Sequence, residues 1–71
     1  MISNRLREWR YKLGFTQQEL TQVAGVSIAT IVLIERYGHI PGEDVRVRIA
    51  TALGMSEATL WPDVEGVDDG K

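Results

Sequence analysis

The chain has 71 residues, of which 44% are hydrophobic and 25% charged, and its formal net charge is −2. This length allows one small domain, and the ordinary globular composition excludes disordered and collagen-like classes. The chain contains no cysteine, which excludes disulfide frameworks, thiolate metal sites and a cysteine nucleophile.

The longest apolar stretch, residues 28–34, is far shorter than the ~20 residues that a membrane-spanning helix needs. The first residues also lack the charged and apolar regions of a secretory signal. The sequence therefore predicts a cytoplasmic protein with no membrane association.

Apolar residues recur at intervals of three and four along most of the chain, which predicts helices throughout. The first helix is expected to bury one face, formed by Ile2, Leu6, Trp9 and Leu13. Gly14 is expected to end this helix, because glycine readily adopts the left-handed conformation that follows many helices.

The next two helices are predicted to begin at Thr16 and Ser27, both of which are good capping residues. Thr16 and Glu19 have the spacing of a capping box. Gly25 separates the two helices, and the second of them is expected to run to about Arg36. The side chains expected to be buried are Leu20, Val23 and Ala24 in one helix and Ile31 and Ile34 in the other.

Residues 37–42 contain two glycines and a proline, which predicts a turn. A fourth helix is expected from about Glu43 to Leu53. Its predicted core residues are Val47, Ile49, Ala50 and Leu53. Ser56 is predicted to cap a short fifth helix that ends before Pro62. Residues 1–61 are therefore expected to form the domain, and residues 62–71 a flexible acidic tail.

Three helix starts share a second pattern, in which one apolar residue precedes the cap and another follows it by four positions. The pairs are Phe15 with Leu20, Val26 with Ile31, and Met55 with Leu60. Such hydrophobic staples fix the angle at which the chain enters a helix. Three of them predict short helices joined by tight turns in an all-α bundle.

Residues 15–35 combine a capped helix, a short turn around Gly25 and a second capped helix, which is the geometry of a helix-turn-helix. The sequence resembles the lambda-repressor/Cro-like (XRE-like) helix-turn-helix family over about residues 3–61. The resemblance lies in RLREWR (5–10), GFTQQEL (14–20), AGVS (24–27), TI (30–31), IER (34–36), Pro41 and RIATALG (48–54). It implies a compact five-helix fold and a repressor-like transcriptional regulator. Such a protein binds double-stranded operator DNA, usually as a homodimer, with no enzymatic activity and no cofactor.

The resemblance also implies roles for individual residues. In that family the third helix enters the major groove, and the positions that face the bases would be Ser27, Ile28, Ala29, Val32 and Leu33. The positions that contact phosphate would be Thr16, Gln17, Gln18 and Arg36. Arg10 and Glu35 would form a structural ion pair between the first and third helices.

The predicted base-facing positions are unusually apolar, because Ile28, Ala29, Val32 and Leu33 offer no hydrogen bonds to base edges. An exposed apolar surface also suits a protein interface. The alternative function is therefore a protein-interaction module of the same fold, which uses residues 28–33 and has weak or lost DNA binding. An enzyme is a distant third, because the sequence has no nucleophile–base pair, phosphate-binding loop or metal cluster.

Overall fold

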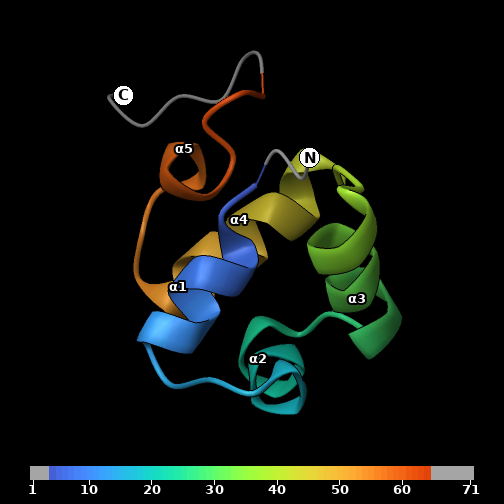
Figure 1. Ribbon diagram of the computed structural model, residues 1–71, viewed down its shortest axis with the longest axis vertical. Coiled ribbons are helices and arrows are strands. Elements are labelled where there is room, and N and C mark those ends of the chain that lie inside the picture. The colour runs from blue at the N-terminus through green and yellow to red at the C-terminus, as the bar shows by residue number, and fades with distance from the viewer. Residues whose placement is uncertain (1–3, 65–71) are drawn as a thin grey trace.

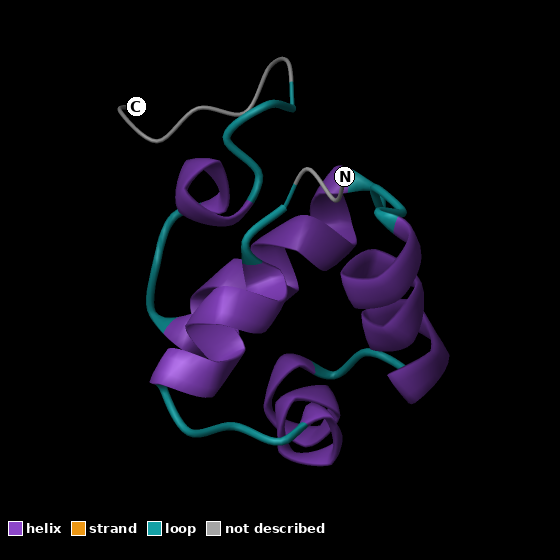
Figure 2. Ribbon diagram, in the orientation of Figure 1, coloured by secondary structure: helices purple, strands orange, loops and turns teal. Residues whose placement is uncertain are grey.

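The computed structural model describes residues 4–64, and in this part of the chain every regular element is a helix (Figures 1 and 2). The helices are α1 (Leu6–Lys12), α2 (Gln17–Ala24), α3 (Ile28–Tyr37), α4 (Glu43–Leu53) and α5 (Glu57–Leu60). The predicted all-α, five-helix fold is confirmed. The predictions for Ile2 and for residues 65–71 fall outside the described residues.

Side-chain caps set the starts of α2, α3 and α5. The Thr16 hydroxyl accepts a hydrogen bond from the Glu19 amide, and the Glu19 carboxylate accepts one from the Thr16 amide, which confirms the predicted capping box. The Ser27 and Ser56 hydroxyls cap α3 and α5 by accepting hydrogen bonds from the amides of Thr30 and Thr59, without the reciprocal bond of a capping box. Gly25 ends α2 at φ 70°, a left-handed conformation that a side chain would strain. The turn between α2 and α3 is therefore fixed by local chemistry.

One hydrophobic core joins all five helices. Its fully buried side chains are Leu6, Leu20, Ile31, Ile34, Ile49, Leu60 and Trp61. The three residues that follow the caps in the predicted staples are among them, and Phe15, Val26 and Met55 pack half-buried against the same core. Val64, which falls in the predicted tail, also packs half-buried against it.

Three residues predicted to be buried are exposed, namely Leu13, Val23 and Val47. Leu13 lies after the last residue of α1, at the turn, where the chain leaves the core. Val23 and Val47 line an open hollow between α2 and α4, beside the buried stripes that contain Ala24 and Ile49. The prediction that these three side chains are buried was therefore wrong.

The arrangement of the helices leaves one side of α3 uncovered. Helix α2 packs against both α3 and α4, α1 packs against α3, and α5 packs against α4. Figure 1 shows α3 on one flank of the bundle and α2 at one end, with a short turn between them. None of the helices within residues 4–64 is long and apolar enough to cross a bilayer.

Candidate nucleic-acid interface

The uncovered side of α3 carries a continuous apolar surface. We define the apolar face of α3 as Ile28, Ala29, Val32 and Leu33. Ile28 is 44% and Leu33 43% exposed, Ala29 is exposed, and Val32 is half-buried. These positions lie within two turns on one side of the helix, whereas Ile31, Ile34 and Glu35 point inward. Arg36 continues the same exposed side in the last turn.

The two hydroxyl groups at the start of α3 belong to its cap. The Ser27 Oγ atom accepts a hydrogen bond from the Thr30 amide at 3.1 Å. It also shares a hydrogen bond with the Thr30 Oγ1 atom at 2.9 Å. The hydroxyl of Ser27, a predicted base-facing position, is thus already engaged with that of Thr30.

The start of α2 presents free backbone donors next to this surface. The capping box uses the amides of Thr16 and Glu19, at 2.9 and 3.0 Å. The amides of Gln17 and Gln18, in the first turn, have no acceptor within the helix. Together with the helix dipole, such donors favour an anion.

A buried polar junction ties α1, α2 and α3 together. The Arg10 guanidinium donates to both oxygens of Glu35, at 2.7 and 3.0 Å, and the two side chains are only 6% and 2% exposed. Arg10 also donates to the Phe15 carbonyl at 2.8 Å, and the Gln17 amide donates to Glu35 at 3.2 Å. We call these four residues the polar junction. The hydrogen bond to Glu35 raises the pKa of Arg10 above its usual value.

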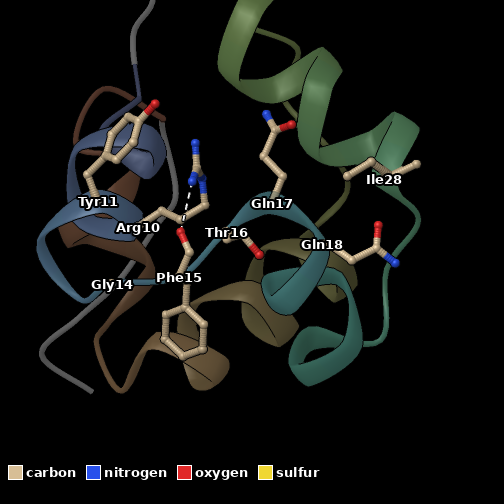
Figure 3. A pocket seen from close by; sticks show the side chains of 8 residues that line it. All are labelled: Arg10, Tyr11, Gly14, Phe15, Thr16, Gln17, Gln18 and Ile28. Carbon is tan, nitrogen blue, oxygen red and sulfur yellow. Dashed lines mark hydrogen bonds between the residues drawn. The ribbon is translucent and has the colours of Figure 1, made fainter.

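Three residues of the polar junction, Arg10, Phe15 and Gln17, help to line an open hollow of about 660 Å³ (Figure 3). The hollow is lined by Arg10, Tyr11, Gly14, Phe15, Thr16, Gln17, Gln18 and Ile28. Figure 3 shows the Gln17 side chain between Arg10 and Ile28. The structure thus brings Thr16, Gln17 and Gln18 next to one base-facing position, Ile28. Leu33 and Arg36 lie further along α3 and do not line the hollow.

Tyr11 and Arg7 belong to this surface, although the sequence patterns did not single out Tyr11 and gave Arg7 no special role. Tyr11 lines the hollow, and the guanidinium carbons of Arg7 and Arg10 lie 5.7 and 4.6 Å from the centre of its ring. The positive charges of the nearby Arg7 and Arg10 lower the pKa of Tyr11 below its usual value. The four-residue spacing of Arg7 and Tyr11 is the signal that would have found the pair.

The charges of the described residues leave two arginines outside any ion pair. Five pairs lie within 4 Å, namely Arg5–Glu8, Lys12–Glu8, Arg10–Glu35, Arg46–Glu57 and Arg48–Asp44. Within residues 4–64, Arg7 on α1 and Arg36 on α3 remain without a carboxylate partner. Both belong to helices that form the surface around the polar junction.

Comparison with known proteins agrees with this geometry. Residues 6–60 match a protein family described as "Helix-turn-helix". The chain is 28% identical over 65 residues to the uncharacterized HTH-type transcriptional regulator YgzD of Bacillus subtilis, covering 90% of this chain and 98% of YgzD. It is 43% identical over 49 residues to an uncharacterized HTH-type transcriptional regulator of Methanothermobacter thermautotrophicus, covering 69% and 71% of the two chains.

A solved structure is also similar. The restriction-modification controller protein C.AhdI from Aeromonas hydrophila superimposes with a TM-score of 0.72 at 27% identity, covering 78% of this chain and 83% of that protein. The span matched by the family includes all five helices, and therefore both the apolar face of α3 and the polar junction.

Proposed function

The chain belongs to the lambda-repressor/Cro-like helix-turn-helix family of DNA-binding transcription regulators, and from this premise we propose that it binds double-stranded DNA sequence-specifically and represses transcription by occupying an operator. It acts in the cytoplasm by non-covalent binding alone, without enzymatic activity and without a cofactor. Residues 1–61 form the DNA-binding unit, and residues 62–71 form its acidic tail.

The observation that carries the proposal is that two groups able to bind an anion lie next to the uncovered side of α3. The free amides of α2 and the Gln17 side chain lie beside the first turn of α3. If α3 lies in the major groove, this geometry sets the start of α2 on the adjacent phosphates. Thr16, Gln17 and Gln18 then contact one phosphate region, and Arg36 contacts another. Ser27 and the apolar face of α3 meet the base edges.

Gln17 is well placed for a phosphate because Glu35 fixes its orientation. Its amide nitrogen donates one hydrogen bond to Glu35 and retains a second N–H for a ligand. The nearby Tyr11 hydroxyl and the unpaired Arg7 extend the same phosphate-binding surface along α1. Both residues are additions to the set that the sequence predicted.

The proposed assembly is a homodimer on a palindromic operator. Two copies related by a two-fold axis place their third helices in successive major grooves, about 34 Å apart. The segment after Gly54 is the proposed contact between the copies. A dimer doubles the number of phosphate contacts and so strengthens the dependence of binding on salt.

A second function is supported by the composition of the exposed surface. Ile28 and Leu33 are each more than 40% exposed and lie close together on one helix. Such a surface suits a protein partner that covers α3 in place of DNA. We favour DNA, because the free amides of α2 and the unpaired Arg36 adjoin the same surface.

Binding of a labelled duplex pool, followed by fluorescence anisotropy at low and moderate salt, tests the proposal. We expect Gln17→Ala and Arg36→Ala to weaken binding. For each phosphate that a variant no longer binds, the salt slope should fall by about 1. One matched control should bind normally: Gln22→Ala removes an exposed amide side chain from the same helix α2.

The two candidate functions give opposite results in this assay. If no duplex binds even at low salt, the proposed function is wrong. If, in addition, Leu33→Glu abolishes self-association or association with a partner protein, the surface serves protein interaction.

A further inference from the structure

The exposed positions of α3 offer almost no hydrogen-bonding capacity to a base. Ser27 and Thr30 bind each other and the backbone in the cap, so only one of their two hydroxyl protons remains unused. Arg36 carries donors, but it lies in the last turn. Between these ends the helix presents only the apolar face of α3, formed by Ile28, Ala29, Val32 and Leu33.

The major groove of DNA contains one apolar group that matches such a surface. Adenine, guanine and cytosine present hydrogen-bond donors and acceptors there, whereas thymine adds the C5-methyl group. An aliphatic side chain against cytosine leaves the amino group of that base without an acceptor, which is costly in a dehydrated contact. The same side chain against a methyl group buries apolar area.

We propose that this protein recognises its operator chiefly through pyrimidine C5-methyl groups, which the apolar face of α3 contacts in the major groove. The proposal rests on the proposed function and names the chemical group that gives it specificity. It assigns contacts with methyl groups to Ile28 and Ala29 in the first turn of α3, and to Val32 and Leu33 in the next.

The charges around the patch identify DNA as the partner of the apolar face. The free amides of Gln17 and Gln18 adjoin Ile28 in the hollow, and the unpaired Arg36 follows Leu33 on the same exposed side of α3. A surface that is apolar in the middle and attracts anions on both flanks matches a groove with methyl groups on its floor and phosphates along its edges.

The proposal predicts a sensitivity to methylation. 5-Methylcytosine carries its methyl group at the same position of the ring as thymine. An operator in which thymine is replaced by cytosine should therefore lose affinity, and methylation of that cytosine should restore part of it. Replacement of thymine by uracil removes the methyl group alone and leaves every hydrogen-bonding group in place.

The experiment begins with selection of bound sites from a random duplex pool by the full chain. Anisotropy then compares each selected duplex with its deoxyuridine, deoxycytidine and 5-methyldeoxycytidine versions. We expect the binding affinity to fall about three- to fourfold for each contacted thymine that is changed to uracil, which is the contribution of one buried methyl group. Where cytosine replaces a contacted thymine, methylation of that cytosine should raise the affinity by a similar factor.

Protein variants assign the contacts to residues. For Ile28→Ala and Leu33→Ala, the ratio of the affinities for the thymine and uracil duplexes should each time come close to 1 at one position of the half-site. Val47→Ala is the matched control, because Val47 is as exposed as Leu33, at 43%, but lies on α4. Circular dichroism verifies that the variants fold, and the comparison of bases in the unaltered protein needs no variant.

Two results would count against the proposal, and they differ in how far they reach. Tight binding of selected duplexes with equal affinity for thymine and uracil would overturn the methyl proposal and leave the proposed function standing. Failure to select any duplex would overturn both.

Discussion

Two arginines each join an ion pair to a backbone carbonyl, and the two ion pairs differ in how deeply they are buried. Arg10 donates to Glu35 on α3 and to the carbonyl of Phe15. Arg46 donates to Glu57 on α5 at 3.0 Å and to the carbonyl of Pro41 at 2.8 Å. The first ion pair is 6% and 2% exposed, and the second is 14% and 15% exposed.

The second difference lies in what each arginine supports. Glu35 binds Arg10 through both oxygens and also accepts from Gln17, so the polar junction fixes α1, α2 and α3 together. Arg46, on α4, binds Glu57 of the short α5 and the carbonyl of Pro41 in the turn before α4. One kind of interaction therefore serves two purposes: the deep ion pair orients the proposed DNA surface, and the shallow one closes the bundle.

The largest expected effect follows from removing the deep ion pair. Arg10→Ala leaves the Glu35 carboxylate buried without a counter-charge, which should lower the free energy of unfolding by about 3–5 kcal/mol. That is a large part of the stability of a small domain. Urea denaturation followed by circular dichroism measures the decrease. A decrease below about 1 kcal/mol would show that Glu35 finds water or another partner.

A double variant separates stability from orientation. Arg10→Met with Glu35→Leu replaces the ion pair by apolar side chains of similar size, which should restore most of the stability. The affinity of the double variant for DNA should be lower than that of the unaltered protein, because Gln17 no longer has the carboxylate that orients it. Full recovery of DNA binding would show that the polar junction serves stability alone.

The shallow ion pair should matter less. Arg46→Ala removes one charged hydrogen-bonded pair and should cost about 1.5–3 kcal/mol in the same urea experiment. DNA contacts made by one copy should be unchanged, since Arg46 lies away from α2 and α3. A cost equal to that of Arg10→Ala would remove the distinction between the deep and the shallow ion pair.

The start of α3 should give a smaller effect again. Ser27→Ala removes the cap and should cost about 1 kcal/mol of stability. Leu33→Ala, on the same helix but at an exposed position, should change stability by less than about 0.5 kcal/mol. Thermal unfolding of the two variants measures the contrast. A large decrease for Leu33→Ala would mean that this side chain is covered in solution.

The smallest effect concerns the titration of Tyr11 at the edge of the polar junction. Because Arg7 and Arg10 lower its pKa, its tyrosinate should form at lower pH than in a free peptide, where the pKa is about 10. Ultraviolet absorbance in a Tyr37→Phe background isolates this group, and Arg7→Ala should move the midpoint upward. The favourable contribution of Tyr11 to folding is complete above the unfolded pKa, declines as pH falls between the two pKa values, and is absent below the folded pKa. An unchanged midpoint in Arg7→Ala would contradict the assignment.

Local features were readily predicted from sequence. The capping box of Thr16 and Glu19 and the glycine at the end of α2 depend only on neighbouring residues, and both are present. The buried partners of the three staples were also predicted, since each staple spans only a few positions. The number and order of the helices followed from these signals.

Features that depend on how helices meet were harder to predict. Val23 and Val47 continue apolar patterns in their helices, but the faces that become buried are set by which helices pack together. Tyr11 lines the same hollow as Gln17 and Ile28, and only the packing of α1, α2 and α3 brings these three residues together. The pairing of Arg10 with Glu35 was expected only through the family resemblance, because 25 positions separate the two residues.

The polar junction has a consequence for how such a protein changes its target. Helix α3 is oriented from its inner side, by Glu35, Ile31 and Ile34, and the exposed side chains of Ile28, Ala29 and Leu33 take no part in holding it. Its outward side chains are therefore interchangeable with little effect on the scaffold. A lineage can acquire a new operator by substitution at Ile28, Ala29 and Leu33 alone, and a designer can graft polar readers there with the rest of the chain untouched.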